Sequence, residues 1–102
     1  MKYGLTDTEI NKLCDLFARY KEIEQVLLYG SRAKGNYKPF SDVDFTLIGE
    51  KLTHSDINQI TWAIDDLLLP YQFDISLFHK LTNPDLIEHI QRKGIVFYQK
   101  KS

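Results

Sequence analysis

The sequence contains a single cysteine and three histidines among its 102 residues. One cysteine excludes a disulfide within the chain and is typical of a protein that works in a reducing cytoplasm. Cys14 has no Cys or His partner at the spacing of a metal site, so we expect a small buried apolar residue on a helix. His54, His79 and His89 are equally scattered, which argues against a zinc site.

Long apolar segments and an excess of positive charge are also missing. No apolar run approaches the ~20 residues of a membrane span, and no signal-peptide pattern opens the chain. The net charge of −1 provides no general attraction to nucleic acid or to anionic lipid. A hydrophobic fraction of 43% is ordinary for a globular protein. We therefore expect one domain over residues 1–102, with neither a membrane nor a nucleic acid as partner.

Hydrophobic periodicity predicts four helices that alternate with four strands, and hence a compact sheet covered by helices. Helix starts are marked by capping residues, and helix ends by glycine or proline. The expected elements are a helix after Thr6 or Asp7, a strand at 25–29, a short helix ending at Gly35, a strand at 42–48, a helix from Thr53 or Ser55 to Pro70, a strand at 72–78, a helix from Asn83 to Gly94, and a strand at 95–98. The third of these helices is expected to bury Ile57, Ile60, Ile64, Leu67 and Leu68.

The segment GSRAKG at residues 30–35 predicts a phosphate-binding turn. Gly30 breaks an apolar strand, and Ser31 suits the N-cap of a short helix, whose exposed amides and dipole attract phosphate. Arg32 and Lys34 follow, where they can contact the phosphates of a nucleotide or remain exposed helix residues of little consequence. No Gly-Lys-Ser/Thr closes the turn, so the segment is not a Walker A loop.

Two aspartates, Asp42 and Asp44, follow Ser31 after a spacer of ten residues. The period of two in a strand sends both carboxylates to one side, with Cα atoms about 6.6 Å apart. Asp74 interrupts a later apolar strand, and three carboxylates converge if the two strands are neighbours. Bound Mg²⁺ would relieve their repulsion. The alternatives are a solvated strand face and an Asp74 paired with a lysine or arginine.

Together these segments resemble the minimal nucleotidyltransferases of the DNA polymerase β superfamily. The family pattern is a hydrophobic strand, Gly-Ser, a spacer, Asp-x-Asp on the next strand, and a third acid on a later strand. Here it is matched at every motif position, by Gly30-Ser31, Asp42-Val43-Asp44 and Asp74. The resemblance covers essentially the whole chain. It implies an α+β fold like the polymerase β palm, a small mixed sheet with helices packed mainly on one face.

The resemblance also implies a reaction. Gly30 and Ser31 would hold the triphosphate of a nucleotide, here ATP, while Asp42 and Asp44 would bind two Mg²⁺ ions. Asp74 would complete the catalytic metal site and help to activate the attacking hydroxyl group. AMP would be transferred with release of pyrophosphate, since two metal ions stabilise both the entering and the leaving oxygen.

Larger relatives carry an additional helical domain that binds the base and the acceptor, for which this chain has no room. Small members are commonly paired with a HEPN-domain protein, an all-helical toxin, and the resemblance implies an antitoxin that adds AMP to such a partner. One alternative is a binding module that neutralises its partner by occlusion. Another is nucleotidyl transfer to a small molecule such as an antibiotic. Homo- and hetero-oligomers are both compatible with the sequence.

Overall fold

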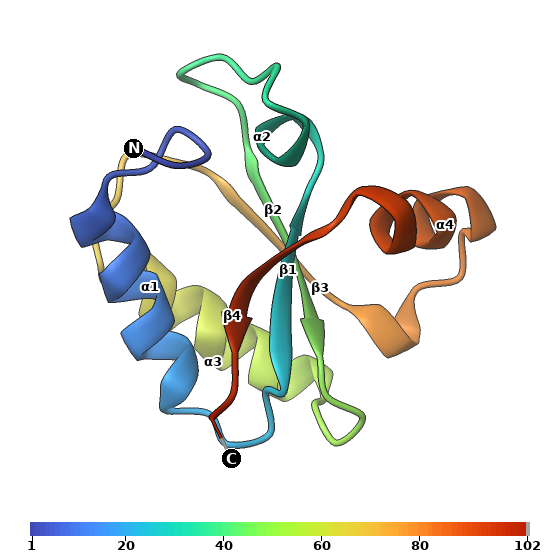
Figure 1. Cartoon of the computed structure of the whole chain (residues 1–102). Coiled ribbons are helices and arrows are strands. Elements are labelled where there is room, and N and C mark those ends of the chain that lie inside the picture. The colour runs from blue at the N-terminus through green and yellow to red at the C-terminus, as the bar shows by residue number, and fades with distance from the viewer. Residues whose placement is uncertain (102) are drawn as a thin grey trace.

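Helices and strands alternate along the chain in the computed structural model, which describes residues 1–101 (Figure 1). This confirms the order predicted from hydrophobic periodicity. The elements are α1 (Asp7–Ala18), β1 (Gln25–Tyr29), α2 (Ser31–Lys34), β2 (Val43–Ile48), α3 (His54–Asp65), β3 (Phe73–Leu77), the 3₁₀ turn η1 (Phe78–Lys80), α4 (Pro84–Lys93) and β4 (Ile95–Gln99).

The four strands form one mixed sheet in the order β3-β2-β1-β4. Strand β1 is antiparallel to both β2 and β4, whereas β2 and β3 are parallel. Parallel neighbours need a crossover connection, and α3 supplies it between β2 and β3. The predicted α+β class with a small mixed sheet is therefore confirmed.

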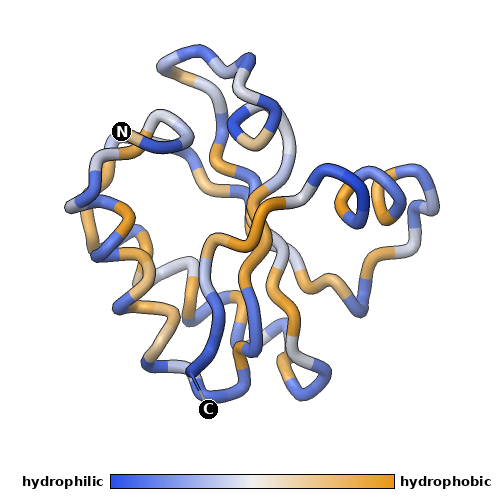
Figure 2. Tube along the Cα trace, in the orientation of Figure 1, coloured by the Kyte–Doolittle hydropathy of each residue, from blue (hydrophilic) through white to orange (hydrophobic). Residues whose placement is uncertain are grey.

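Helices α1 and α3 lie together over one face of the sheet, and α4 lies on the other side of β1 (Figure 1). Alternate apolar residues of β1 and β2 point toward α1 and α3, and hydrophobic stretches of the trace come together where the strands cross in the view (Figure 2). The Phe45 ring packs 5.5 Å from Phe17 of α1 and 4.8 Å from Phe97 of β4, centroid to centroid. Among residues 1–101, no helix is both long and apolar enough for a membrane crossing.

The predicted capping residues begin the three long helices. Thr6 and Thr53 each form a reciprocal capping box with the acidic residue three positions later, which satisfies two amides that the helix leaves free. The Asn83 side chain accepts hydrogen bonds from the amides of Asp85 and Leu86 at the start of α4. Local chemistry at these positions was sufficient to place the helix starts.

The end of α3 differs from the prediction. The helix stops at Asp65 rather than continuing to Pro70, because the last turn tightens into short-range bonds such as Leu67 N to Ile64 O (3.0 Å). Leu68 then adopts φ 56°, which turns its side chain out of the core, and it is 87% exposed. The expectation that Leu68 is buried was wrong, whereas Leu67 packs against the core as predicted.

Leu68→Gly is expected to raise the free energy of unfolding by about 0.5–1 kcal/mol. The left-handed conformation costs a residue with a Cβ about 1–2 kcal/mol, which exceeds the conformational entropy that glycine adds to the unfolded chain. Urea unfolding measures the change. Asp66→Gly is the matched control, since Asp66 is exposed with φ −66°, and there the same replacement should destabilise. Equal destabilisation by both variants would contradict the argument.

Candidate active site

A row of polar side chains crosses the sheet on the face opposite the apolar core. In the antiparallel register Tyr29 of β1 is the partner of Asp44 in β2, and in the parallel register Asp44 is the partner of Asp74 in β3. Partner residues on adjacent strands lie about 4.8 Å apart along the hydrogen-bonding direction and point to the same face. Asp42 precedes β2 by one residue and shares the face of Asp44. The structure thus brings the strands of the three predicted aspartates together.

The pKa of the Asp44 carboxyl group shows the effect of the neighbouring aspartates. Partial burial, followed by the negative charges of Asp74 and Asp42, raises its pKa from 3.8 to about 6, and Arg32 lowers it by a smaller amount. The same surroundings act on Tyr29, whose pKa is raised by burial first and then by Asp74 and Asp44. Asp44 lies at the centre of a negative field that a cation would relieve.

The glycine turn at residues 30–35 packs directly against the side chain of Asp44. Gly30 has φ 78°, and a Cβ added there would collide with the Oδ2 atom of Asp44. The backbone conformation therefore requires glycine, and any larger residue would also force the Asp44 carboxylate to move. Gly30 is also the N-cap of α2 and has no side-chain cap bond, so the prediction that Ser31 is the N-cap was wrong. Ser31 is instead the first helical residue, and Gly35 ends α2 at φ 85° as predicted.

Arg32 is placed differently from the expectation that it contacts phosphate. Its side chain is buried, with 2% of its surface exposed, and the guanidinium donates to backbone carbonyl groups on the protein side of α2. A guanidinium committed in this way is not available to a nucleotide, and we leave Arg32 out of the phosphate site. Lys34 is exposed on α2, and its predicted role stays a prediction.

The donors that could hold a metal are carboxylate oxygens, the ligands that Mg²⁺ prefers. Within residues 1–101, no three His, Cys, Asp or Glu side chains are arranged to enclose a metal ion. Asp42, Asp44 and Asp74 nevertheless share one face of the sheet, and the three-aspartate metal centre stays a prediction. Their chemistry fits magnesium, because a hard cation would offset the charges that raise the pKa of Asp44.

Thr46 and Ser76 extend this polar face and were not among the residues predicted from the sequence. They are register partners on β2 and β3, and the Ser76 hydroxyl donates to Thr46 Oγ1 at 3.0 Å. Each follows an aspartate by two positions, so the period of two could have identified them from Asp44 and Asp74. This neutral pair lies beside the aspartates and adds no further negative charge to their face.

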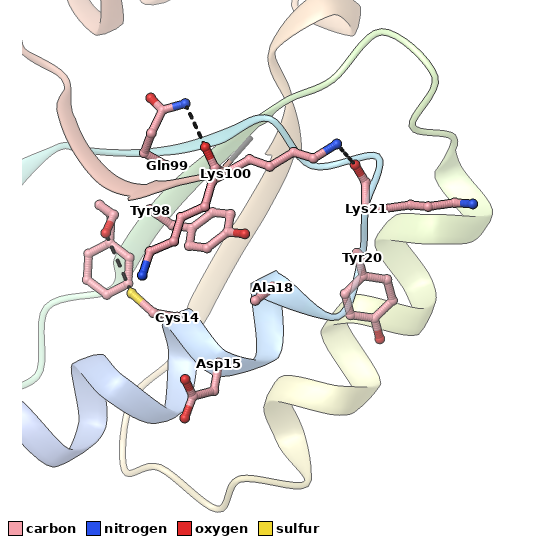
Figure 3. Close-up of a pocket in the computed structure, with 10 residues that line it drawn as sticks. Cys14, Asp15, Ala18, Tyr20, Lys21, Tyr98, Gln99 and Lys100 are labelled. Carbon is pink, nitrogen blue, oxygen red and sulfur yellow. Dashed lines mark hydrogen bonds between the residues drawn. The ribbon is translucent and has the colours of Figure 1, made fainter.

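A groove of about 570 Å³ lies elsewhere, between α1 and β4 (Figure 3). Cys14, Tyr20, Lys21 and Tyr98 are among its lining residues, and none of the aspartates of the β2–β3 face takes part. The Cys14 thiol is half-buried in its wall and donates to the Phe97 carbonyl at 3.6 Å. Burial, with a smaller contribution from Asp15, raises the pKa of the thiol, which makes Cys14 a poor nucleophile.

The family model for polymerase beta nucleotidyltransferases matches residues 11–102, which is most of the chain. None of the curated proteins matches the sequence. The matched residues include Gly30, Ser31, Asp42, Asp44 and Asp74.

Solved structures share the fold over nearly the whole chain. A minimal nucleotidyltransferase is 27% identical with a TM-score of 0.71, and the alignment covers 93% of this chain and 95% of that one. A toxin–antitoxin crystallised with AMP-PNP is 17% identical with a TM-score of 0.71, covering 95% and 76% respectively. The toxin–antitoxin MntA–HepT is 13% identical with a TM-score of 0.67, covering 93% and 74%.

Gly30→Ala is expected to abolish Mg²⁺–ATP binding and to lower the free energy of unfolding by at least about 1–2 kcal/mol. The Gly30 backbone, with φ 78° and ψ −156°, lies in a region that is essentially restricted to glycine, which accounts for that energy, and the contact of the Cβ with Asp44 adds to it. Gly35→Ala is the control for positive φ alone, because Gly35 has φ 85° and ψ 3° and a Cβ there meets nothing within 4 Å. Calorimetric titration and urea unfolding measure both effects. Equal loss of binding in the two variants would show that the contact with Asp44 is irrelevant.

Asp44→Asn is expected to stabilise the metal-free protein at pH 7.5 and to have little effect near pH 4. The pKa of about 6 in the fold exceeds the ordinary 3.8, so ionisation disfavours folding. The contribution of Asp44 to wild-type stability should fall as pH rises from about 4 to 6, where Asp44 loses its proton in the unfolded chain first, and should then level off. The partly solvated carboxylate limits the difference to on the order of 1 kcal/mol. Thermal unfolding in EDTA across this range is the measurement, and a difference independent of pH would contradict it.

Proposed function

Because the chain belongs to the polymerase β nucleotidyltransferase family, we propose that it transfers AMP from ATP to a hydroxyl group with the help of two Mg²⁺ ions. The observation that carries the proposal is the register of Asp44 beside Asp74 and against Gly30. It unites a phosphate turn with carboxylates whose charges already influence one another.

Each residue of the site has a distinct part. The first amides of α2, after Gly30 and Ser31, have no acceptor within the helix and would donate to the triphosphate. Asp42, Asp44 and Asp74 would hold the magnesium ions. Bound magnesium would neutralise charge on the phosphates and on the entering and leaving oxygens. Lys34, exposed on α2, would contribute a further positive charge toward the phosphates.

The reaction forms a bond from the acceptor oxygen to the α-phosphorus and breaks the bond to the β-phosphate, which leaves as pyrophosphate. The acceptor must lose its proton, and the Asp74 carboxylate is suited to take it, because it is exposed at the edge strand β3. Asp42 is exposed as well. An acceptor can therefore approach the carboxylates directly from outside.

We infer that this acceptor is a protein, with a HEPN-type toxin as the leading candidate. The open aspartate face suits a side-chain hydroxyl that is presented on another molecule. The structural neighbours crystallised as toxin–antitoxin pairs, one of them with AMP-PNP, support this choice. In this role the protein acts as an antitoxin in the cytoplasm by adding AMP to its partner.

The test is to incubate the protein with α-labelled ATP, Mg²⁺ and the folded HEPN-type partner. We expect the partner to become labelled with a mass increase of one AMP. Asp42→Asn combined with Asp44→Asn should reduce the rate on the order of 100-fold or more, because the carboxylates that hold the metal ions are lost. Asp66→Asn, an exposed carboxylate outside the site, serves as control.

The outcomes separate the alternatives. Absence of label on a folded partner, together with neutralisation of toxicity by the double variant as well as by wild type, would establish occlusion and contradict catalysis. If a hydroxylated small molecule is labelled and the partner is not, the acceptor is a small molecule and the protein acceptor is excluded. If the double variant labels the partner as fast as wild type does, Asp42 and Asp44 have no role in the transfer.

A further inference from the structure

The guanidinium of Arg32 joins α2 to the N-terminal turn and to the loop before β2. Its Nε and Nη2 atoms donate to the Ser41 carbonyl at 3.1 and 2.8 Å, and Nη1 donates to the Tyr3 carbonyl at 2.8 Å. A longer bond from Nη2 reaches the Pro39 carbonyl at 3.4 Å. These acceptors lie in the N-terminal turn and in the loop that leads to β2. Arginine suits this task because its planar fork offers five donors, whereas lysine offers one point of attachment.

Aromatic rings enclose the same group. The carbon at the centre of the guanidinium lies 5.3 Å from the Tyr37 ring centroid and 5.0 Å from that of Tyr71, which are cation–π distances. The Tyr71 hydroxyl in turn donates to Glu9 Oε1 at 2.9 Å. A buried charge whose hydrogen bonds all go to carbonyl groups is costly to desolvate.

The positions of Arg32 and Ser41 in the sequence show which parts of the site the guanidinium connects. Arg32 follows Ser31 of the phosphate turn, and its main acceptor, Ser41, precedes Asp42. We propose that Arg32 is a positioning residue, whose buried guanidinium holds the start of β2 at a set distance from the phosphate turn. Its effect on nucleotide binding rests on the function proposed above, whereas its hold on the start of β2 does not.

The N-terminal turn is shaped to receive this group. Gly4 has φ 76°, and a Cβ added there would lie 2.5 Å from Arg32 Nη1 and 2.6 Å from Tyr37 Cε2. Only a glycine at this position lets the backbone close over the guanidinium. We call the Arg32 guanidinium with its bonds to the Tyr3 and Ser41 carbonyl groups the Arg32 clamp. Gly4→Ala displaces this clamp while every hydrogen-bonding group of Arg32 is kept, which makes it a useful second variant.

The experiment compares Arg32→Lys and Gly4→Ala with Ile64→Val, a core variant in α3 expected to lose about 0.5–1.5 kcal/mol without touching the clamp. Amide hydrogen exchange is followed at Ser41 and Val43, which donate to the carbonyls of Lys38 and Gln72. We expect exchange at these two amides to be about tenfold faster in both clamp variants. In Ile64→Val, exchange at the Ser41 and Val43 amides should change no more than exchange at core amides far from Arg32. Unchanged exchange at these amides in both clamp variants would overturn the proposal.

Calorimetric titration of Mg²⁺–ATP then tests the link to the site. The dissociation constant should rise about 10–100-fold in Arg32→Lys and stay near wild type in Ile64→Val, as for residues that orient metal ligands. Faster exchange with unaltered affinity would refute the positioning role toward nucleotide. A wild-type protein that binds no Mg²⁺–ATP, but shows the exchange effect, would refute the proposed function and leave the hold on β2 established.

Discussion

The parallel pairing of β2 with β3 is the constraint on which the site depends. It sets Asp44 beside Asp74 on the face that the core does not use, while Phe45 and Ile75 point into the core. A slip of one residue would exchange these faces and bury a carboxylate among the helices. The apolar residues of both strands therefore fix the position of the charged ones, and packing energy maintains a cluster of like charges that would otherwise separate.

A second set of contacts joins this cluster to the phosphate turn. Gly30 touches Asp44 from one side, and the Arg32 clamp ties the residue before Asp42 to the helix after the turn. Both contacts need a particular residue type, since only glycine leaves room for the carboxylate and only arginine supplies a fork of donors. The turn and the aspartates thus form one unit, although ten residues separate Ser31 from Asp42.

Local signals predicted much of this arrangement. Capping residues placed the starts of the three long helices, hydrophobic periodicity placed the strands, and the glycine turn followed by Asp-Val-Asp carried the resemblance to nucleotidyltransferases. The predictions were wrong where distant contacts decide. Leu68 fits the periodicity of a buried helix face, yet α3 ends before it. Arg32 has the chemistry of a phosphate ligand, and only the carbonyls of Tyr3 and Ser41, supplied by other segments, direct it inward.

The sequence by itself therefore determined the alternating order of helices and strands, the glycine turn at residues 30–35 and the spacing of the aspartates, because these follow from periodicity and from residue types at short spacing. The tertiary structure alone decided that Asp74 is the partner of Asp44, that Gly30 touches the carboxylate and that Arg32 is buried. Those facts depend on strand register and on backbone groups far apart in the chain. Every residue has a backbone carbonyl oxygen, so the sequence does not indicate which of them will accept hydrogen bonds from a buried guanidinium.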